Sequence, residues 1–193
     1  MRILIIYAHP YPGSFNHAIL KTVTDTLQNS NHDYEVIDLN KENFNPVLTE
    51  EELKVYSQGK YLDPTVGEYL EKIKNSDHLI LIFPIWWGGV PAILKGFFDK
   101  VFLKKETYEF KGLMPIAKLK NTSATVISTM NAPKIFYSFW LKSPIKQTVI
   151  RSTLKLCGVK KVKWFKLARV VSVSNAKRRK MLNKIKKYFK KLN

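Results

Sequence analysis

Residues 1–14 read MRILIIYAHPYPGS, and they carry the strongest structural signal in the chain. Ile3-Leu4-Ile5-Ile6 is a continuous apolar run rich in β-branched side chains, and it ends at Ala8-His9-Pro10. A short run of this kind is typical of a strand that is buried on both faces, at the centre of a parallel sheet. The stretch therefore predicts a central strand that ends in a loop.

Four more stretches predict strands of the same sheet. Residues 78–83 and 124–128 are apolar in the same way, whereas 34–39 and 161–165 have the weaker pattern of outer strands. Apolar positions at helical spacing predict helices in five stretches, over residues 14–29, 65–75, 91–102, 138–156 and 175–192.

Strands that alternate with helices indicate βαβ units, and therefore a parallel sheet with helices on both faces. Five strands in 193 residues fit an α/β fold of the flavodoxin-like kind, a three-layer sandwich around a five-stranded parallel sheet in the order 2-1-3-4-5. A six-stranded Rossmann layout is the alternative, but its G-x-G-x-x-G fingerprint is missing. We expect residues 1–193 to form a single domain that closes with a basic amphipathic helix at about 175–192.

The composition excludes several classes of protein. With 45% apolar residues, 8 Gly and 9 Pro, the chain is expected to be neither disordered nor fibrous. Its one cysteine, Cys157, excludes a disulfide framework and a cysteine-built metal centre, and it indicates a reduced, cytoplasmic compartment. The first residues have the pattern of neither a signal peptide nor a transmembrane segment, and no carboxylate group has metal-ligand spacing.

The charge is unevenly distributed along the chain. Residues 1–99 hold 8 basic and 13 acidic side chains, whereas residues 100–193 hold 25 basic and 2 acidic ones. A surplus of this size favours an anionic partner, such as a phosphorylated cofactor, an anionic membrane or nucleic acid. The basic helix at 175–192 fits either binding to such a surface or docking on the sheet, and its apolar spacing favours docking.

Ligands of doubly wound sheets bind beyond the carboxyl ends of the strands, where the strand order switches. This rule selects three loops, at residues 9–14, 84–91 and 129–137. In the first, Ser14 predicts a helix N-cap, and the N–H groups that follow it suit the phosphate of a nucleotide. An ordinary strand-to-helix turn has the same composition.

The second loop, Pro84-Ile-Trp-Trp-Gly-Gly-Val-Pro91, places two adjacent tryptophans after a strand. Both cannot point into the core, so one is expected at the crevice, where a flat aromatic ligand would stack. A cap on the end of the sheet or a dimer contact is the alternative role. The third loop, Ser128-Thr-Met-Asn-Ala-Pro133, adds hydroxyl and amide groups beside the crevice, or is an ordinary polar turn.

Two motifs resemble the flavodoxin-fold NAD(P)H:quinone oxidoreductases of the DT-diaphorase type. They are His9-Pro with Ser14-Phe-Asn-His-Ala18, and Pro84-Ile-Trp-Trp-Gly-Gly-Val-Pro-Ala-Ile-Leu-Lys-Gly-Phe-Phe-Asp-Lys-Val-Phe102. The resemblance implies a flavin-dependent two-electron reductase that is usually a homodimer with the flavin at the subunit interface. It also implies a ping-pong reaction, in which NAD(P)H gives a hydride to the flavin and a quinone takes it from the same stacking site.

The resemblance further implies roles for individual residues. It places at the flavin phosphate His9, Ser14, Phe15, Asn16 and Ala18. It places along or beside the flavin ring Pro84, Ile85, Trp86, Trp87, Gly88, Ser128 and Thr129, and the adjacent Asn131 is a further candidate for cofactor binding. Tyr137 and Trp87 are the candidate catalytic residues. The chain departs from the family at Met130-Asn131, where two glycines are common, and at Lys142, which falls about where a histidine assists hydride transfer.

Several alternatives stay open at this point. The resemblance of the first loop favours FAD over FMN, and NAD(P)H is the implied co-substrate. A quinone, an azo dye, a nitroaromatic compound and free flavin all fit a flat stacking site. A flavoprotein that regulates a transport system and a basic polyanion-binding protein without turnover are the alternative functions.

The aromatic side chains of two segments, 91–102 and 136–145, exceed what one five-stranded domain readily covers. They predict a two-fold homodimer with these segments at its interface.

Overall fold

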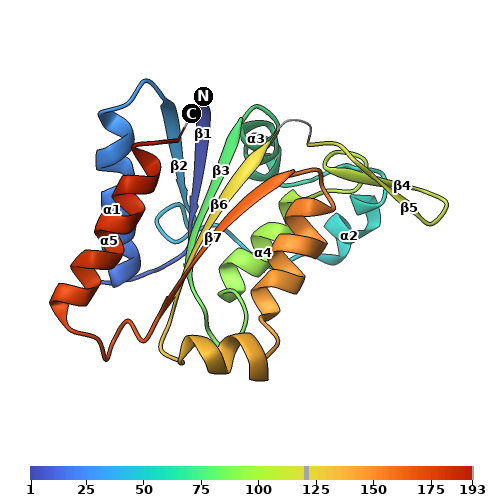
Figure 1. Cartoon of the computed structure of the whole chain (residues 1–193). Coiled ribbons are helices and arrows are strands. Elements are labelled where there is room, and N and C mark those ends of the chain that lie inside the picture. The colour runs from blue at the N-terminus through green and yellow to red at the C-terminus, as the bar shows by residue number, and fades with distance from the viewer. Residues whose placement is uncertain (120–121, 193) are drawn as a thin grey trace.

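The computed structural model describes residues 1–119 and 122–192, and its centre is a sheet of five parallel strands (Figure 1). In spatial order the strands are β2 (Asp33–Asp38), β1 (Arg2–Tyr7), β3 (His78–Pro84), β6 (Ser123–Met130) and β7 (Lys161–Ala168). Counted along the chain within this sheet, the order is 2-1-3-4-5. The predicted flavodoxin-like fold is therefore confirmed.

The apolar runs of the sequence occupy the middle of the sheet. Ile3 of β1 pairs with His78 of β3, and Tyr7 pairs with Ile82 in the same register. Every residue of β3 is buried, whereas the outer strands β2 and β7 alternate between more and less exposed positions. A central strand without a polar face has to be covered on both sides.

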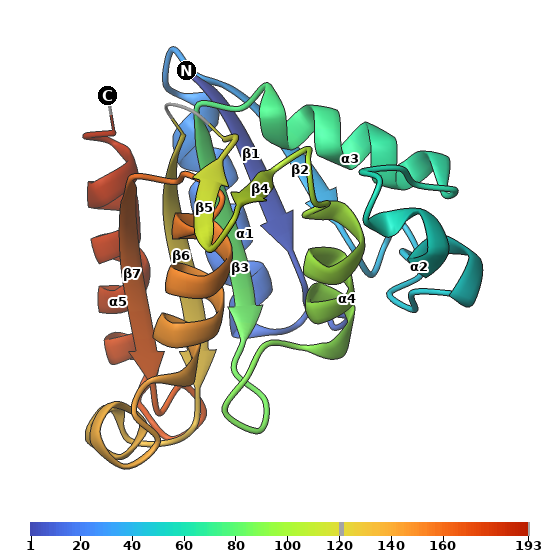
Figure 2. The same ribbon diagram turned by 90° about the vertical axis from the view of Figure 1, so that its right-hand side faces the viewer.

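Helices supply that cover on both faces (Figures 1 and 2). On one face α1 (Phe15–Gln28) and α5 (Asn175–Phe189) lie side by side. On the other face lie α3 (Pro64–Lys74) and α4 (Ala92–Val101). Each face has its own apolar core, and neighbouring residues of a strand contribute to opposite cores.

The helix predicted over residues 138–156 has a different form. The structure has two π-helical segments here, η1 (Phe136–Trp140) and η2 (Lys146–Lys155). Lys142 and Ser143, between them, both have a φ of 52°. Pro144 follows, and a proline has no N–H to donate and disfavours helical geometry in the residue before it. One continuous helix is therefore interrupted at Ser143-Pro144.

Two further elements lie outside the sequence prediction. Helix α2 (Glu50–Tyr56) begins with a capping box, in which Thr49 and Glu52 each accept the other's backbone N–H, at 3.2 and 2.8 Å. A hairpin of β4 (Tyr108–Lys111) and β5 (Met114–Ala117) projects beside α4 and turns at Gly112, where φ is 60°. The sequence signals for these elements are Thr-x-x-Glu and, in the hairpin, the glycine of the two-residue loop Gly112-Leu113.

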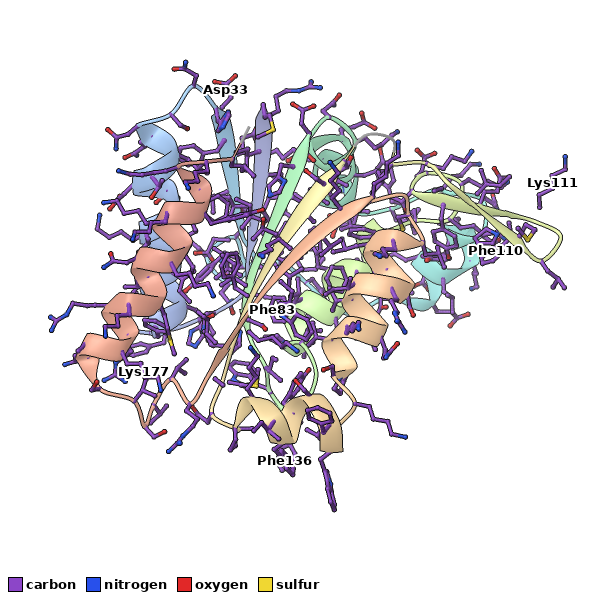
Figure 3. All side chains as sticks on the ribbon, in the orientation of Figure 1. Asp33, Phe83, Phe110, Lys111, Phe136 and Lys177 are labelled. Atoms are coloured by element: carbon purple, nitrogen blue, oxygen red, sulfur yellow. The ribbon has the colours of Figure 1, made fainter. Side chains whose placement is uncertain are left out.

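Helix α5 docks on the sheet as its spacing predicts. Ile185 and Phe189 are buried, and Met181, Leu182 and Tyr188 pack partly buried beside them. The lysine side of the helix faces solvent (Figure 3). Docking on the sheet therefore accounts for the apolar stripe of this helix.

The aromatic side chains of residues 91–102 are buried within the chain, so they are not the uncovered aromatic surface from which the dimer interface was predicted. Phe97 is fully buried, with its ring centroid 5.9 Å from that of Phe44 and 5.7 Å from that of Tyr69. Phe98 and Phe102 pack against each other at 5.5 Å. The loop after β2 and helix α3 cover this cluster, a contact between distant segments that residue spacing does not reveal.

A buried histidine joins the amino ends of β3 and β6. Its two ring nitrogens lie 2.7 Å from Ser123 Oγ and 2.9 Å from Thr125 Oγ1, and Thr125 donates to the hydroxyl of Tyr188 at 3.2 Å. This histidine, His78, is 2% exposed, and burial lowers its pKa to about 4.

Acid should therefore weaken the fold through His78. The pKa is about 4 in the folded chain and 6.5 in an ordinary environment, so the unfolded state takes up the proton first as the pH falls. The free energy of unfolding should therefore fall by about 3 kcal/mol between pH 6.5 and pH 4 because of this group. Urea unfolding of His78→Gln should show a smaller loss over this range than wild type or the matched control His17→Gln. Equal losses in all three proteins would contradict the assignment.

Candidate active site

The carboxyl ends of β1, β3 and β6 deliver three loops to one cavity of about 580 Å³. That volume lies in the range of small-molecule and cofactor sites. The loops after β3 and β6 reach the same end of the sheet, where Figure 3 labels Phe136. The predicted site residues that line the cavity are His9, Ser14, Phe15, Asn16, Ala18, Pro84, Ile85, Trp86, Thr129 and Asn131.

Helix α1 meets the cavity with a capped N-terminus. Ser14 has an extended backbone, with φ −78° and ψ 158°, and its hydroxyl accepts the N–H of His17 at 3.1 Å. The N–H groups of Phe15 and Asn16 have no acceptor within the helix, and the helix dipole adds partial positive charge there. This end of the cavity therefore suits an anion such as a phosphate.

Hydrogen bonds join the three loops to one another. Asn16 Nδ2 donates to Thr129 Oγ1 at 2.9 Å, and both residues are 3% exposed. The carbonyl of Thr129 accepts the N–H of Ile85 at 2.7 Å. Asn16 Oδ1 is buried and has no partner among residues 1–119 and 122–192. Buried polar atoms are rarely left without a partner, so this acceptor is available to a ligand or a water in the cavity.

His9 contributes a neutral donor at the cavity wall. Its Nδ1 accepts the N–H of Tyr11 at 3.1 Å, so the neutral ring carries its proton on Nε2. Burial lowers the pKa of His9, which keeps the ring neutral at pH 7. The ring lies edge-on to Trp86, with 6.0 Å between centroids.

The two tryptophans occupy different places. Trp86 and Gly89 exchange N–H···O bonds of 3.1 and 2.9 Å around a tight turn, with Trp87 at φ 50° and Gly88 at φ 80°. Positive φ at both central positions is the geometry of a type I′ turn, which is unfavourable for tryptophan. Trp86 is 46% exposed and lines the cavity, whereas Trp87 is fully exposed and does not line it.

The other predicted residues, Gly88, Ser128 and Tyr137, do not line the cavity. Ser128 is buried, and its hydroxyl accepts the indole N–H of Trp164 at 2.9 Å. Tyr137 is also buried; its hydroxyl donates to the carbonyl of Gly88 at 3.0 Å and accepts the N–H of Ile145 at 3.1 Å. The hydroxyl of Tyr137 therefore fastens the turn after β3 to the segment between η1 and η2.

Three lining residues, Tyr11, Gly13 and Met130, lie in the predicted loops but were not named as site residues. Val170, Val171 and Arg178 come from the segment after β7 and from α5, which lie outside the three predicted loops. Arg178 alone among them brings charge. Its guanidinium donates to the carbonyl of Val170 at 2.6 Å and to Asn175 Oδ1 at 2.8 Å, and neither partner is a carboxylate. The basic run 177–180 does not itself reveal which side chain turns to the cavity.

The groups around the cavity fit a flavin nucleotide. The N–H groups at the start of α1 suit its phosphate, and the wall of Ile85, Trp86 and Met130 suits its flat ring. His9 Nε2–H and Asn16 Oδ1 supply one donor and one acceptor for its polar groups.

Comparison with known proteins identifies the relatives of this chain. The family described as Flavodoxin-like fold matches residues 1–190. The chain is 30% identical to an uncharacterized NAD(P)H oxidoreductase of Haemophilus influenzae, over 85% of this chain and 82% of that protein. It is 29% identical to NAD(P)H dehydrogenase (quinone) 1 of Cavia porcellus, over 71% of this chain and 56% of that protein.

One solved structure extends the likeness to almost the whole chain. The NAD(P)H:quinone oxidoreductase from Methanothermobacter marburgensis superposes with a TM-score of 0.87 at 28% identity, over 98% of this chain and 96% of that one. The chain thus spans nearly all of this relative, but little more than half of the Cavia porcellus enzyme.

Substitution of the two tryptophans should separate their roles. Trp86→Ala should lower the flavin content of the purified protein about fivefold, because it removes an aromatic wall of the cavity. Trp87→Gly should leave the flavin content unchanged and stabilise the fold by about 1 kcal/mol, because glycine accepts positive φ without strain. Absorbance spectra and thermal melts measure both effects. A greater flavin loss in the Trp87 variant would place Trp87, as the sequence predicts, against the ring.

Proposed function

Because the chain belongs to the flavodoxin-like fold family of NAD(P)H quinone oxidoreductases, we propose that it uses a bound flavin to reduce a quinone with NAD(P)H. In the overall reaction NAD(P)H gives up a hydride and becomes NAD(P)⁺, and the quinone takes up the equivalent of that hydride and one proton to become the hydroquinone. One observation carries the proposal: the bonds of Asn16, Thr129 and Ile85 hold an anion site and an aromatic wall in a single cavity.

The residues of the cavity have distinct proposed roles. The N–H groups of Phe15 and Asn16 and the Nε2–H of His9 bind the flavin phosphate, and Trp86 flanks the ring. The flavin supplies reversible two-electron storage, which lets nucleotide and quinone use the same face in turn, in a ping-pong reaction. The protein supplies position and electrostatics.

Two predicted catalytic residues acquire narrower proposed roles. Tyr137 is a positioning residue, because both bonding functions of its hydroxyl are occupied by Gly88 and Ile145. The N–H groups of Trp86 and Gly89 are used in the hydrogen bonds that these two residues exchange. The N–H groups of Trp87 and Gly88 are therefore the ones in this turn that a ligand could use. Neither residue lines the cavity, but both follow Trp86, which does, and we propose that these two N–H groups stabilise negative charge on the reduced ring from the edge of the cavity.

Arg178 favours FAD over FMN as the bound flavin. FMN has one phosphate, which the N-terminus of α1 accommodates, whereas FAD has a second phosphate and an adenosine. Arg178 brings a positive charge to the cavity wall, and its hydrogen bonds to neutral groups leave that charge for an anionic ligand. The second phosphate of FAD is the group that would meet it.

A matched pair of arginine variants tests the function and the cofactor together. Arg178→Gln should weaken flavin binding about tenfold, as expected for the loss of one charge-assisted contact. Arg179→Gln removes the same charge from an exposed neighbour on the outer groove between α1 and α5, and should leave binding unchanged. Wild type should carry FAD by mass spectrometry and turn over NADPH and quinone with parallel-line kinetics. A colourless wild-type protein without turnover would refute the function.

We also propose a homodimer, through the face formed by α4 and the hairpin. Leu113 and Met114 at the hairpin tip are 96% and 71% exposed (the neighbouring Phe110 and Lys111 are labelled in Figure 3). Beside the hairpin, α4 and η2 border a cavity of about 400 Å³ with an apolar lining that includes Phe98 and Leu156. In a two-fold contact each tip would fill the partner's cavity.

Charges on this face permit self-association, because both signs are present. Lys95 and Asp99 form an ion pair at 2.6 Å on α4, and Lys118 pairs with Glu109 at 3.0 Å across the hairpin. When this face of one copy contacts the same face of another, the opposite charges balance, so like charges do not oppose the contact.

Aspartate at the hairpin tip should dissociate the dimer. Light scattering of wild type should give twice the chain mass of 22.4 kDa, and Leu113→Asp with Met114→Asp should give the mass of one chain. Leu53→Asp, at an apolar residue of α2 that is 60% exposed, is the control that should remain dimeric. A monomeric wild type, or an unchanged mass in the hairpin variant, would contradict this interface.

A further inference from the structure

The uneven charge of the sequence becomes an uneven charge of the folded molecule. Residues 122–192 contain 19 Lys and Arg side chains and no Asp or Glu. They form β6, β7, η1, η2 and α5, and β6 and β7 lie at one edge of the sheet, with β2 at the opposite edge (Figure 1). One side of the molecule is therefore strongly positive.

The cations on this side have no carboxylate partners in the part of the chain that the structure describes. Every ion pair in that part joins two side chains that lie between Lys21 and Lys118 in the sequence. Burial, together with the nearby charges of Lys134 and Lys146, lowers the pKa of Lys166, which shows that unpaired cations gather here. Their positive charge is left for an anion from outside the chain.

Some of this charge lies at the mouth of the cavity. Arg178 and Val170 line the cavity. Their chain neighbours, Lys177 and Arg169, are exposed, and we call these two cations the rim pair. Lys177 lies at the same end of the molecule as Phe136, where the carboxyl ends of the strands deliver their loops (Figure 3). Because Arg178 is assigned to the second phosphate of FAD, the rim pair is left for the nucleotide that reduces the flavin.

Carboxylates lie away from this mouth. No Asp or Glu is among the described residues that line the cavity. Asp38 ends β2 at the same end of the sheet, but β2 and the strands β3 and β6 lie on opposite sides of β1. The glutamates of α3 lie on the face of the sheet opposite α1 and α5, which line the cavity. An anion that approaches the cavity therefore meets mostly positive charge.

The position of the rim pair distinguishes between the anionic partners that the sequence leaves open. Among the described residues, no helix is long and apolar enough to span a bilayer. The rim pair lies beside a cavity of about 580 Å³, which has the size of a small-molecule or cofactor site. A phosphorylated small molecule is the partner that fits both the charge and the cavity.

NADH and NADPH differ in one group, a phosphate on the adenosine ribose of NADPH. A phosphate monoester carries about −1.5 to −2 charges at pH 7. A positive potential raises the local concentration and the association rate of an anion, by about 10- to 1,000-fold where a cleft focuses the charge, and the gain grows with the charge of the anion. The potential at the mouth of the cavity therefore favours NADPH over NADH.

We propose that the electron donor is NADPH rather than NADH, and that the positive charge of the rim pair selects it through its additional phosphate. The inference rests on the proposed function, because it names the donor of that reaction. The additional phosphate lies at the adenosine end of the nucleotide, away from the nicotinamide that gives the hydride. Selection therefore acts on the capture of NADPH, so it raises kcat/KM and leaves kcat unchanged.

Steady-state kinetics with an uncharged, water-soluble quinone tests the selection. For wild type with its bound flavin, kcat/KM for NADPH should exceed that for NADH at least about tenfold at about 10 mM salt, where the Debye length is about 30 Å. The ratio should fall towards one at about 1 M salt, where the Debye length is about 3 Å. Equal kcat/KM values at low salt, or a ratio that salt leaves unchanged, would overturn selection by charge.

A matched pair of variants tests the place of the selection. At physiological ionic strength, Arg169→Gln with Lys177→Gln should lower kcat/KM about fivefold for NADPH and less than about twofold for NADH. Lys187→Gln with Lys191→Gln removes equal charge from the other end of α5 (Figure 1), about 15 Å or more along the helix from Lys177, and should change neither value by more than about twofold. Equal losses in the two variants would overturn the role of the rim pair.

Binding of a nucleotide fragment separates this inference from the proposed function. By calorimetry at low salt, the flavin-loaded wild type should bind adenosine 2′,5′-bisphosphate at least tenfold more tightly than AMP, and the rim-pair variant should lose most of this difference. Equal affinities, or equal turnover with NADH and NADPH, would overturn the inference and leave the proposed function intact. Tighter binding of the bisphosphate by a protein that reduces no quinone with either nucleotide would refute the proposed function and leave selection by charge intact.

Discussion

Three central strands without a solvent-exposed face constrain the rest of this structure. Because β1, β3 and β6 are buried on both sides, each has to return to the sheet through a covering segment, and all three run in the same direction. Their carboxyl ends therefore meet at one edge, and the loops that follow them have to share it. The cavity is a consequence of this topology.

Hydrogen bonds between the three loops give this shared edge the geometry of a binding site. The bond from Asn16 to Thr129, and the bond that Thr129 accepts from Ile85, fix the spacing of three loops at once. They set the N-terminus of α1, with its partial positive charge, opposite an aromatic wall. An anionic nucleotide with a flat ring needs both features together, and neither feature alone distinguishes this fold from others.

The sequence could predict the sheet, because continuous apolar runs are typical of strands that are buried on both faces. It could predict most of the cavity, because the topology selects the loops. The features that the sequence did not predict depend on the direction in which individual side chains point. Ser128 and Thr129 are neighbours in a strand and face opposite sides, so Thr129 meets Asn16 on α1 while Ser128 meets Trp164. Trp86 and Trp87 have different surroundings because Trp87 has a positive φ in the turn, a conformation that a tryptophan does not predict. The helix break at Ser143-Pro144 was readable from the proline, whereas the position of Arg178 depends on the register of α5.

The central claim is that the cavity binds a flavin that passes two electrons from NAD(P)H to a quinone in separate half-reactions. An anaerobic titration of the protein with its bound flavin tests this most directly. One equivalent of NADPH should bleach the flavin absorbance, and after removal of the nucleotide by gel filtration one equivalent of quinone should restore it. Absorbance that NADPH leaves unchanged, or that quinone restores only while nucleotide is present, would contradict the account.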